Sequence, residues 1–180
     1  KETFVAIETD PEASFTRTRL VYNDHGNAEP TVTIGDYRDV LLSRLFETML
    51  NNRLDEIANN PNPPFTFGYS FHGSGWSRNK ESYQSISMSS PENQLKSFEV
   101  LVEENERVYR HGFIASEFDR AKKEMMAQLE SVLKNKDKLE SNRLTYEYVN
   151  NFLEDEYIPG VEWEYATSKT LISQITLDEV

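Results

Sequence analysis

Residues 65–71 read Phe-Thr-Phe-Gly-Tyr-Ser-Phe, with an aromatic side chain at every second position. Because successive side chains of a strand point to opposite faces, this pattern predicts a strand with one buried face. Residues 72–75, His-Gly-Ser-Gly, are expected to break the strand, and residues 83–89 to return beside it as an antiparallel neighbour. We interpret the aromatic stripe as part of the core rather than as a ligand cage.

The segments on either side of this hairpin predict further strands and several helices. Strands are expected at 4–7 and 16–22, and helices at 36–58, 90–111, from 116 onward, 138–153 and 162–172. The proline-rich residues 59–64 cannot continue a helix and mark the end of the first one. This order of elements predicts an α+β fold, in which helices cover one face of an antiparallel sheet.

Composition excludes several classes of partner. The formal net charge of −12 opposes binding to nucleic acid or to an anionic membrane surface. The sequence contains no cysteine, so a disulfide framework and a cysteine-ligated metal are both excluded. No stretch approaches the roughly 20 apolar residues of a membrane helix, so no membrane insertion is expected, and the composition leaves the compartment unknown.

A search for catalytic patterns finds none. The histidines His25, His72 and His111 are isolated from one another, and none lies in an HExxH or HxxEH motif. We therefore expect them to be exposed or structural, although three remote histidines could still converge in space. No Gly-x-Ser-x-Gly elbow is present, and no pair of carboxylates stands out for acid–base chemistry. The sequence predicts no catalytic residue and no metal ligand, and hence no enzyme in this chain by itself.

The last residues suggest that the chain is part of something longer. Residues 176–179, Thr-Leu-Asp-Glu, have the pattern of a helix start with its capping partner, yet the sequence stops one residue later. It also begins at Lys1 rather than at methionine. We expect residues 1–180 to be a single domain with chain missing at both ends.

A series of short segments resembles the insulinase and pitrilysin family of zinc peptidases, and in particular the second domain of its long bacterial members. The segments cover nearly the whole chain in the family's order. They are residues 36–38 (DYR), 49–57 (MLNNRLDEI), 63–65 (PPF), 110–113 (RHGF), 117–122 (EFDRAK), 147–149 (EYV), 152–154 (FLE), 158–160 (IPG) and 175–180 (ITLDEV). Each match is weak alone, and the series is specific.

The resemblance implies a function for the longer protein. Members of the family have two halves, each of two related α+β domains, that close around an unfolded peptide. Their first domain carries the zinc motif HxxEH, which is absent from this sequence. The resemblance thus implies a non-catalytic, chamber-forming domain, with zinc in the parent enzyme and no cofactor here. Its partners would be the adjacent catalytic domain of the same polypeptide and a peptide in the closed chamber, and a location in the bacterial cell envelope or periplasm would fit.

Two residues are candidate substrate contacts by the same resemblance. Arg53 and Tyr69 occupy places roughly comparable to an Arg and a Tyr that contact substrate in the family's other half. The proline-rich insertion between them alters the spacing, so a structural Arg and a core Tyr are the alternative that we favour. For the whole chain, the alternatives are a domain of an inactive homologue that serves in assembly or peptide binding, and a free-standing binding module. The unfinished helix at Thr176 argues against the module.

Overall fold

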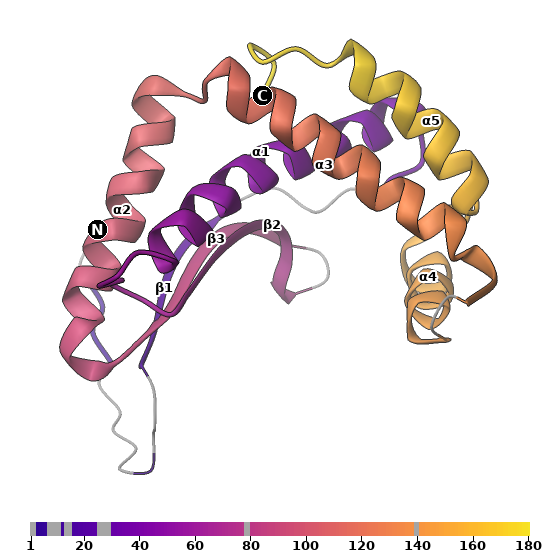
Figure 1. Cartoon of the computed structure of the whole chain (residues 1–180). Coiled ribbons are helices and arrows are strands. Elements are labelled where there is room, and N and C mark those ends of the chain that lie inside the picture. The colour runs from indigo at the N-terminus through magenta and orange to yellow at the C-terminus, as the bar shows by residue number, and fades with distance from the viewer. Residues whose placement is uncertain (1–2, 7–11, 13–15, 25–29, 78–79, 139–140) are drawn as a thin grey trace.

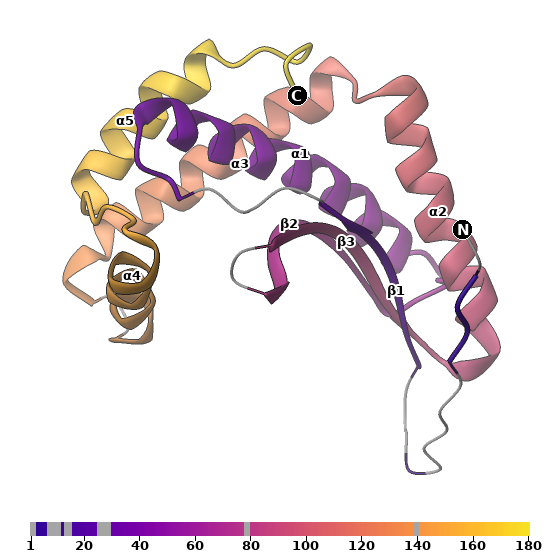
Figure 2. The ribbon, with the colours of Figure 1, turned by 180° about the vertical axis from the view of Figure 1, so that it is seen from behind.

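The computed structural model describes residues 3–6, 12, 16–24, 30–77, 80–138 and 141–180. Its elements are β1 (Thr16–Asn23), α1 (Ile34–Ala58), β2 (Phe67–Ser77), β3 (Lys80–Ser89), a 3-10 turn at Pro91–Asn93, α2 (Gln94–His111), α3 (Ala115–Lys134), a second 3-10 turn at Lys136–Lys138, α4 (Ser141–Glu154) and α5 (Val161–Gln174). The helices form an arch above a small curved sheet, and α4 descends from the far end of the arch (Figures 1 and 2).

The described sheet has three antiparallel strands in the order β1-β3-β2. The predicted pairing of β2 with β3 is confirmed, but the predicted break at residues 72–75 is wrong. The ladder continues as far as Ser74, with His72 opposite Tyr83 and Gly73 opposite Ser82, and only between Ser74 and Ser77 does its register shift. Pairing with a neighbouring strand outweighs the low strand propensity of glycine, which is a weak local preference.

Helices cover one face of the sheet, as the sequence predicted. Helix α1 lies over β2, and α2 contacts both β1 and β3 (Figure 1). Helix α1 begins two residues earlier than expected, because Thr33 and Asp36 form a capping box. The Thr33 hydroxyl accepts from the Asp36 N–H at 3.1 Å, and the Asp36 carboxylate accepts from the Thr33 N–H at 2.8 Å.

The main apolar core lies between helices rather than under the sheet. It consists of buried residues from α1, α3 and α5, namely Leu41, Leu45, Met49, Phe118, Ala121, Met125, Leu171, Ile172 and Ile175. A smaller cluster of Leu54, Phe65 and Leu101 joins the end of α1 to the sheet and α2. Helix α1 therefore packs on helices as far as Met49, and at Leu54 it packs on the cluster that joins the sheet.

Between the sheet and its helices lies a layer of small polar side chains. Ser70, Ser85 and Ser87 are fully buried on the covered face. The Ser70 and Ser85 hydroxyls share a hydrogen bond, and Ser87 shares another with Ser97 of α2. Small side chains let the helix approach the strands closely, and their mutual hydrogen bonds offset the cost of burying them.

Other expectations for the element boundaries were also wrong. Residues 3–6 form no strand, and Phe4 is 97% exposed; Ile7, the last residue of the predicted strand, lies outside the described part of the chain. The helix expected at residue 90 begins at Gln94, after a 3-10 turn. Helix α3 begins at Ala115, where the Glu117 carboxylate accepts from the Ile114 N–H at 2.9 Å.

Candidate functional site

Arg53 is engaged within the fold. Its guanidinium pairs with both carboxylate oxygens of Glu117, at 2.6 and 2.8 Å, and donates to the Gly112 carbonyl at 3.2 Å. The group also lies over the Phe113 ring, and its side chain is 13% exposed. The Arg53 guanidinium is the main cause of a lowered pKa of Glu117. Arg53 therefore ties the end of α1 to the turn between α2 and α3.

Tyr69 lies on the opposite, uncovered face of the sheet and is 41% exposed. The expectation of a core tyrosine is wrong. The same holds for most of the aromatic stripe, because Phe67 is 47% exposed and only Phe65 is buried. The rings of Phe67, Tyr69 and Phe71 stack in sequence, with centroids 6.3 and 6.0 Å apart. Arg53 and Tyr69 thus lie in different surroundings, one paired with Glu117 and the other on the uncovered face.

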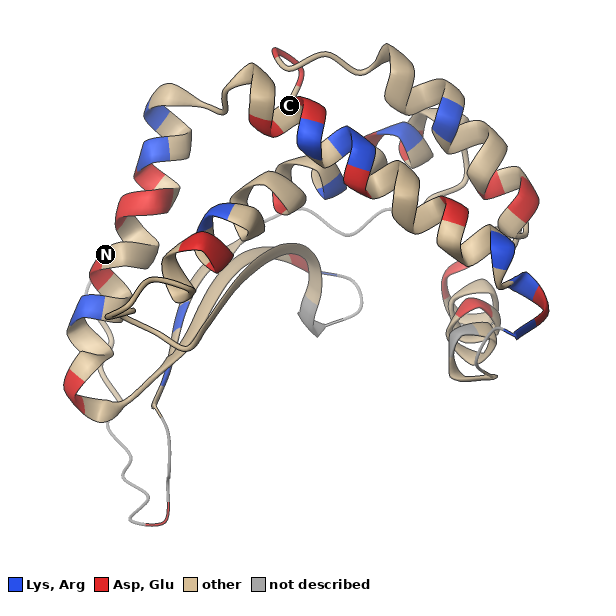
Figure 3. Ribbon diagram, in the orientation of Figure 1, with Lys and Arg blue, Asp and Glu red and all other residues tan. Residues whose placement is uncertain are grey.

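The stripe is one column of a surface that we name the open face. By strand register the open face has three rows across β1, β3 and β2: Arg17, Met88 and Phe67; Arg19, Ile86 and Tyr69; Val21, Gln84 and Phe71. Aromatic residues fill the β2 column, two apolar residues dominate the β3 column, and two arginines stand on β1. In Figure 3 the ribbon of β2 and β3 is largely uncharged, whereas β1 carries basic residues.

The outer edge of β2 is closed by side chains of α1. The Asn51 amide donates to the Ser70 carbonyl at 2.9 Å and accepts from the Ser70 N–H at 2.7 Å. The Glu47 carboxylate accepts from the His72 N–H at 2.7 Å. Exposed strand edges invite pairing with other chains, and these bonds occupy the backbone groups that such pairing would use. Burial is the main cause of the raised pKa of Glu47.

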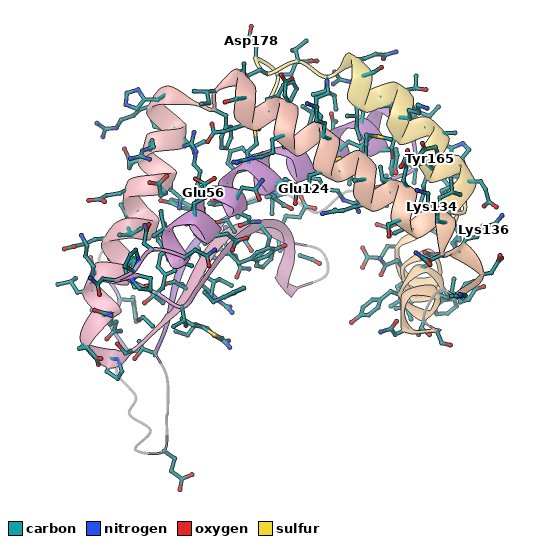
Figure 4. All side chains as sticks on the ribbon, in the orientation of Figure 1. Glu56, Glu124, Lys134, Lys136, Tyr165 and Asp178 are labelled. Atoms are coloured by element: carbon teal, nitrogen blue, oxygen red, sulfur yellow. The ribbon has the colours of Figure 1, made fainter. Side chains whose placement is uncertain are left out.

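A groove of about 1200 Å³ continues from Tyr69 along the inner side of the arch. Helices α1, α3 and α4 line it, together with the chain after α4 and the start of α5. In Figure 4, Glu124 of α3 lies beside α1, and its carboxylate accepts from the Asn52 amide at 3.1 Å. The acidic residues that line the groove are Glu47, Asp55, Glu124, Glu147, Glu156 and Glu164. The groove is therefore acidic, unlike the adjoining open face.

The described residues offer no place for a metal ion. No group of three or more His, Cys, Asp or Glu side chains in the described part of the chain is arranged to hold one. His72 lies on β2 with its Nε2 3.8 Å from a Glu81 oxygen, and His111 ends α2. His25 lies outside the described residues.

None of the described helices is long and apolar enough to cross a membrane.

Comparison with known proteins gives one match in sequence and several in structure. No family model matches the chain. The chain is 32% identical over 148 residues to a protein of Arabidopsis thaliana described as "Zinc protease PQQL-like". The match covers 82% of this chain and 12% of that protein. The chain thus spans a small part of its relative's length.

Two solved structures share the fold over almost the whole chain. The first half of the periplasmic protease PqqL from Escherichia coli superposes with a TM-score of 0.81 at 19% identity, over 94% of this chain and 36% of that one. A predicted insulinase family protease from Yersinia pestis gives a TM-score of 0.77 at 13% identity, over 93% and 36%.

Fold and sequence agree on the class of protein. The chain is an α+β domain of the kind that builds the halves of these proteases. It belongs to the insulinase family of proteases, as the series of short segments predicted.

Proposed function

We propose that this chain is a non-catalytic, chamber-forming domain of a zinc-dependent endopeptidase that degrades unfolded peptides. The observation that carries the proposal is the sequence match to a zinc protease over most of the chain, together with a fold shared with protease halves. The residues that the structure describes do not fit zinc, since they offer no group of metal-binding side chains. The zinc site would therefore belong to a preceding domain, and no step of hydrolysis is assigned to these residues.

The proposed partners follow from this role. Residues 1–180 would form one domain that supports the adjacent catalytic domain of the same polypeptide. The concave side of the arch, with the open face and the groove, would face a peptide inside the chamber. The periplasm of a bacterium is the location we propose, because the structurally similar Escherichia coli protein is a periplasmic protease.

Metal content and proteolysis of the purified chain test the proposal. We expect no stoichiometric zinc and no cleavage of a mixture of unstructured peptides with zinc added, and cleavage once the preceding domain is restored. Zinc-dependent cleavage by the chain alone, surviving stringent purification, would overturn the non-catalytic role.

The second candidate is a domain of an inactive homologue that serves in assembly or peptide binding. The absence of a metal-binding group from the described residues is equally compatible with it. The sequence encoded upstream of Lys1 discriminates between the two. An HxxEH motif there supports an active parent, and an upstream domain without it supports the inactive homologue.

A further inference from the structure

The open face differs in charge from the rest of the chain. The sequence has 31 acidic and 19 basic residues, yet the nine described positions of the open face include two arginines and no carboxylate. Arg17 and Arg19 are both exposed. The field of an acidic domain repels an acidic ligand over most of its surface, so this face is where such a ligand would meet attraction instead.

Apart from Arg17, Arg19 and Gln84, which is 1% exposed, the positions of the open face are apolar or aromatic. Phe67 and Tyr69 are 47% and 41% exposed, and Phe71, Ile86 and Met88 are partly buried. A contiguous exposed apolar patch of this kind marks an interaction surface rather than ordinary surface composition. A ligand that matches this face carries aromatic or aliphatic side chains where it meets β2 and β3, and carboxylates where it meets the arginines of β1.

The hydrogen bonds along the outer edge of β2 determine whether a peptide can bind there by strand addition. Because Asn51 and Glu47 already occupy the backbone groups of Ser70 and His72, a peptide cannot add to this edge as a further strand there. Strand addition would bind through the main chain and would tolerate most sequences. At this edge, recognition must instead use side chains, which makes it selective.

We propose that the open face is a docking surface for extended polypeptide segments that combine acidic and apolar side chains, with Arg17 and Arg19 as the residues that determine charge preference. This inference rests on the proposed function, and names the class of substrate segment that this wall of the chamber accepts. The acidic groove beyond Tyr69 bounds the surface on one side and disfavours the same acidic residues.

The test measures binding of two fluorescent peptides to the 180-residue chain by anisotropy. The peptides have equal length and the same apolar residues, and differ only in carrying Glu or Lys. We expect the Glu peptide to bind roughly tenfold more tightly, because an exposed charge pair contributes up to about a factor of five and two arginines are present. The preference should shrink as salt is raised.

Variants separate the charge contribution from the apolar one. Arg17→Glu with Arg19→Glu should reverse the preference, and Arg17→Gln with Arg19→Gln should abolish it with less risk to the fold. The control is Lys96→Glu with Arg110→Glu on α2, which makes the same change in net charge away from the open face. The side chains of Lys96 and Arg110 are 61% and 68% exposed, and this variant should keep the preference for the Glu peptide. Tyr69→Ser should lower the affinity of the chain for both peptides by the same factor. Circular dichroism checks that each variant is folded.

Several results would overturn the inference. They are equal binding of the two peptides, no binding of either, or an equal loss of preference in the β1 and α2 variants. Self-association of the chain that Tyr69→Ser abolishes would identify the face as a contact between copies and would also overturn it. None of these results bears on zinc in the preceding domain, so the proposed function is tested separately.

Discussion

The two faces of the sheet are built from the same strands and differ in almost every other respect. On the covered face, serines are fully buried and joined to one another by hydrogen bonds, and Phe65 fills the gap to α1 and α2. On the open face, stacked aromatic rings stand partly exposed beside two arginines. We therefore expect the covered face to supply most of the stability of the domain, and the open face to supply little of it.

Phe65→Ala should be the most damaging single change to this arrangement. Phe65 is 1% exposed and packs with Leu54 and Leu101. Removing the ring loses its burial and leaves a cavity, which costs about 3–5 kcal/mol of unfolding free energy. Chemical denaturation measures the loss. A cost near zero would mean that this cluster does not anchor the sheet to its helices.

Arg53→Met should lower the free energy of unfolding by about 1.5–3 kcal/mol, less than Phe65→Ala. The substitution keeps most of the side chain's bulk, but removes charged hydrogen bonds to Glu117 and leaves that carboxylate, whose side chain is 13% exposed, without its partner. Arg120→Met is the control, because its pair with Glu56 is about half exposed and surface pairs contribute little. If both variants lose the same stability, Arg53 has no special part in holding the turn between α2 and α3.

Gly68→Ala tests how closely the covered face is packed. A Cβ at Gly68 would lie 2.8 Å from the Phe65 ring and 3.3 Å from the Leu54 Cβ. Overpacking of this kind costs about 1–3 kcal/mol. Phe65→Leu removes the atoms in conflict, so the double variant should be more stable than the sum of the two single effects predicts. Strictly additive effects would contradict the proposed contact.

Acid should lower the free energy of unfolding through the protonation of Glu117. Its pKa lies below the usual 4.5 in the folded protein, chiefly because it accepts hydrogen bonds from Arg53. A lowered pKa contributes stability that is complete above about pH 4.5 and is lost as the pH falls through the folded-state value. In Arg53→Met the pH dependence of stability below 4.5 should therefore be shallower than in the parent chain. An unchanged slope would assign the acid sensitivity to other carboxylates.

Phe67→Ser should have the smallest effect on stability, less than about 1 kcal/mol. Phe67 is 47% exposed, so little burial is lost, and what remains is its contact with the neighbouring ring of Tyr69. Comparison with Phe65→Ala in the same denaturation series is the sharpest measure of the difference between the two faces. A loss as large as that of Phe65→Ala would mean that the open face is part of the core.

The helices were the most predictable part of the fold. Prolines at residues 61, 63 and 64 end α1, and Gly112, at φ +63°, ends α2 where the sequence placed the boundary. The apolar stripe of α3 became core at Phe118, Ala121 and Met125. Such signals are local, since they depend on backbone dihedral angles and on helical spacing within one segment.

The candidate site was less predictable, because alternation does not identify the buried face. Residues 65–71 fitted one buried stripe, yet Phe65 precedes β2 and joins the covered cluster, whereas Phe67 and Tyr69 lie on the open face. The edge-closing amide of Asn51 was also missed. It lies 19 residues from Ser70 in sequence, and no local pattern joins them. Whether Arg53 and Tyr69 contact a substrate in the longer protein stays a prediction.

The sequence by itself determined the α+β class, the ends of α1 and α2 and the family, because spacing, capping and short matched segments are properties of the chain read in order. Tertiary structure alone decided which sheet face is covered, that Arg53 pairs with Glu117, and that three aromatic rings line a basic, apolar surface. These features join residues that are far apart in sequence. Their energies come from burial and from pairing in space, which only the packed chain defines.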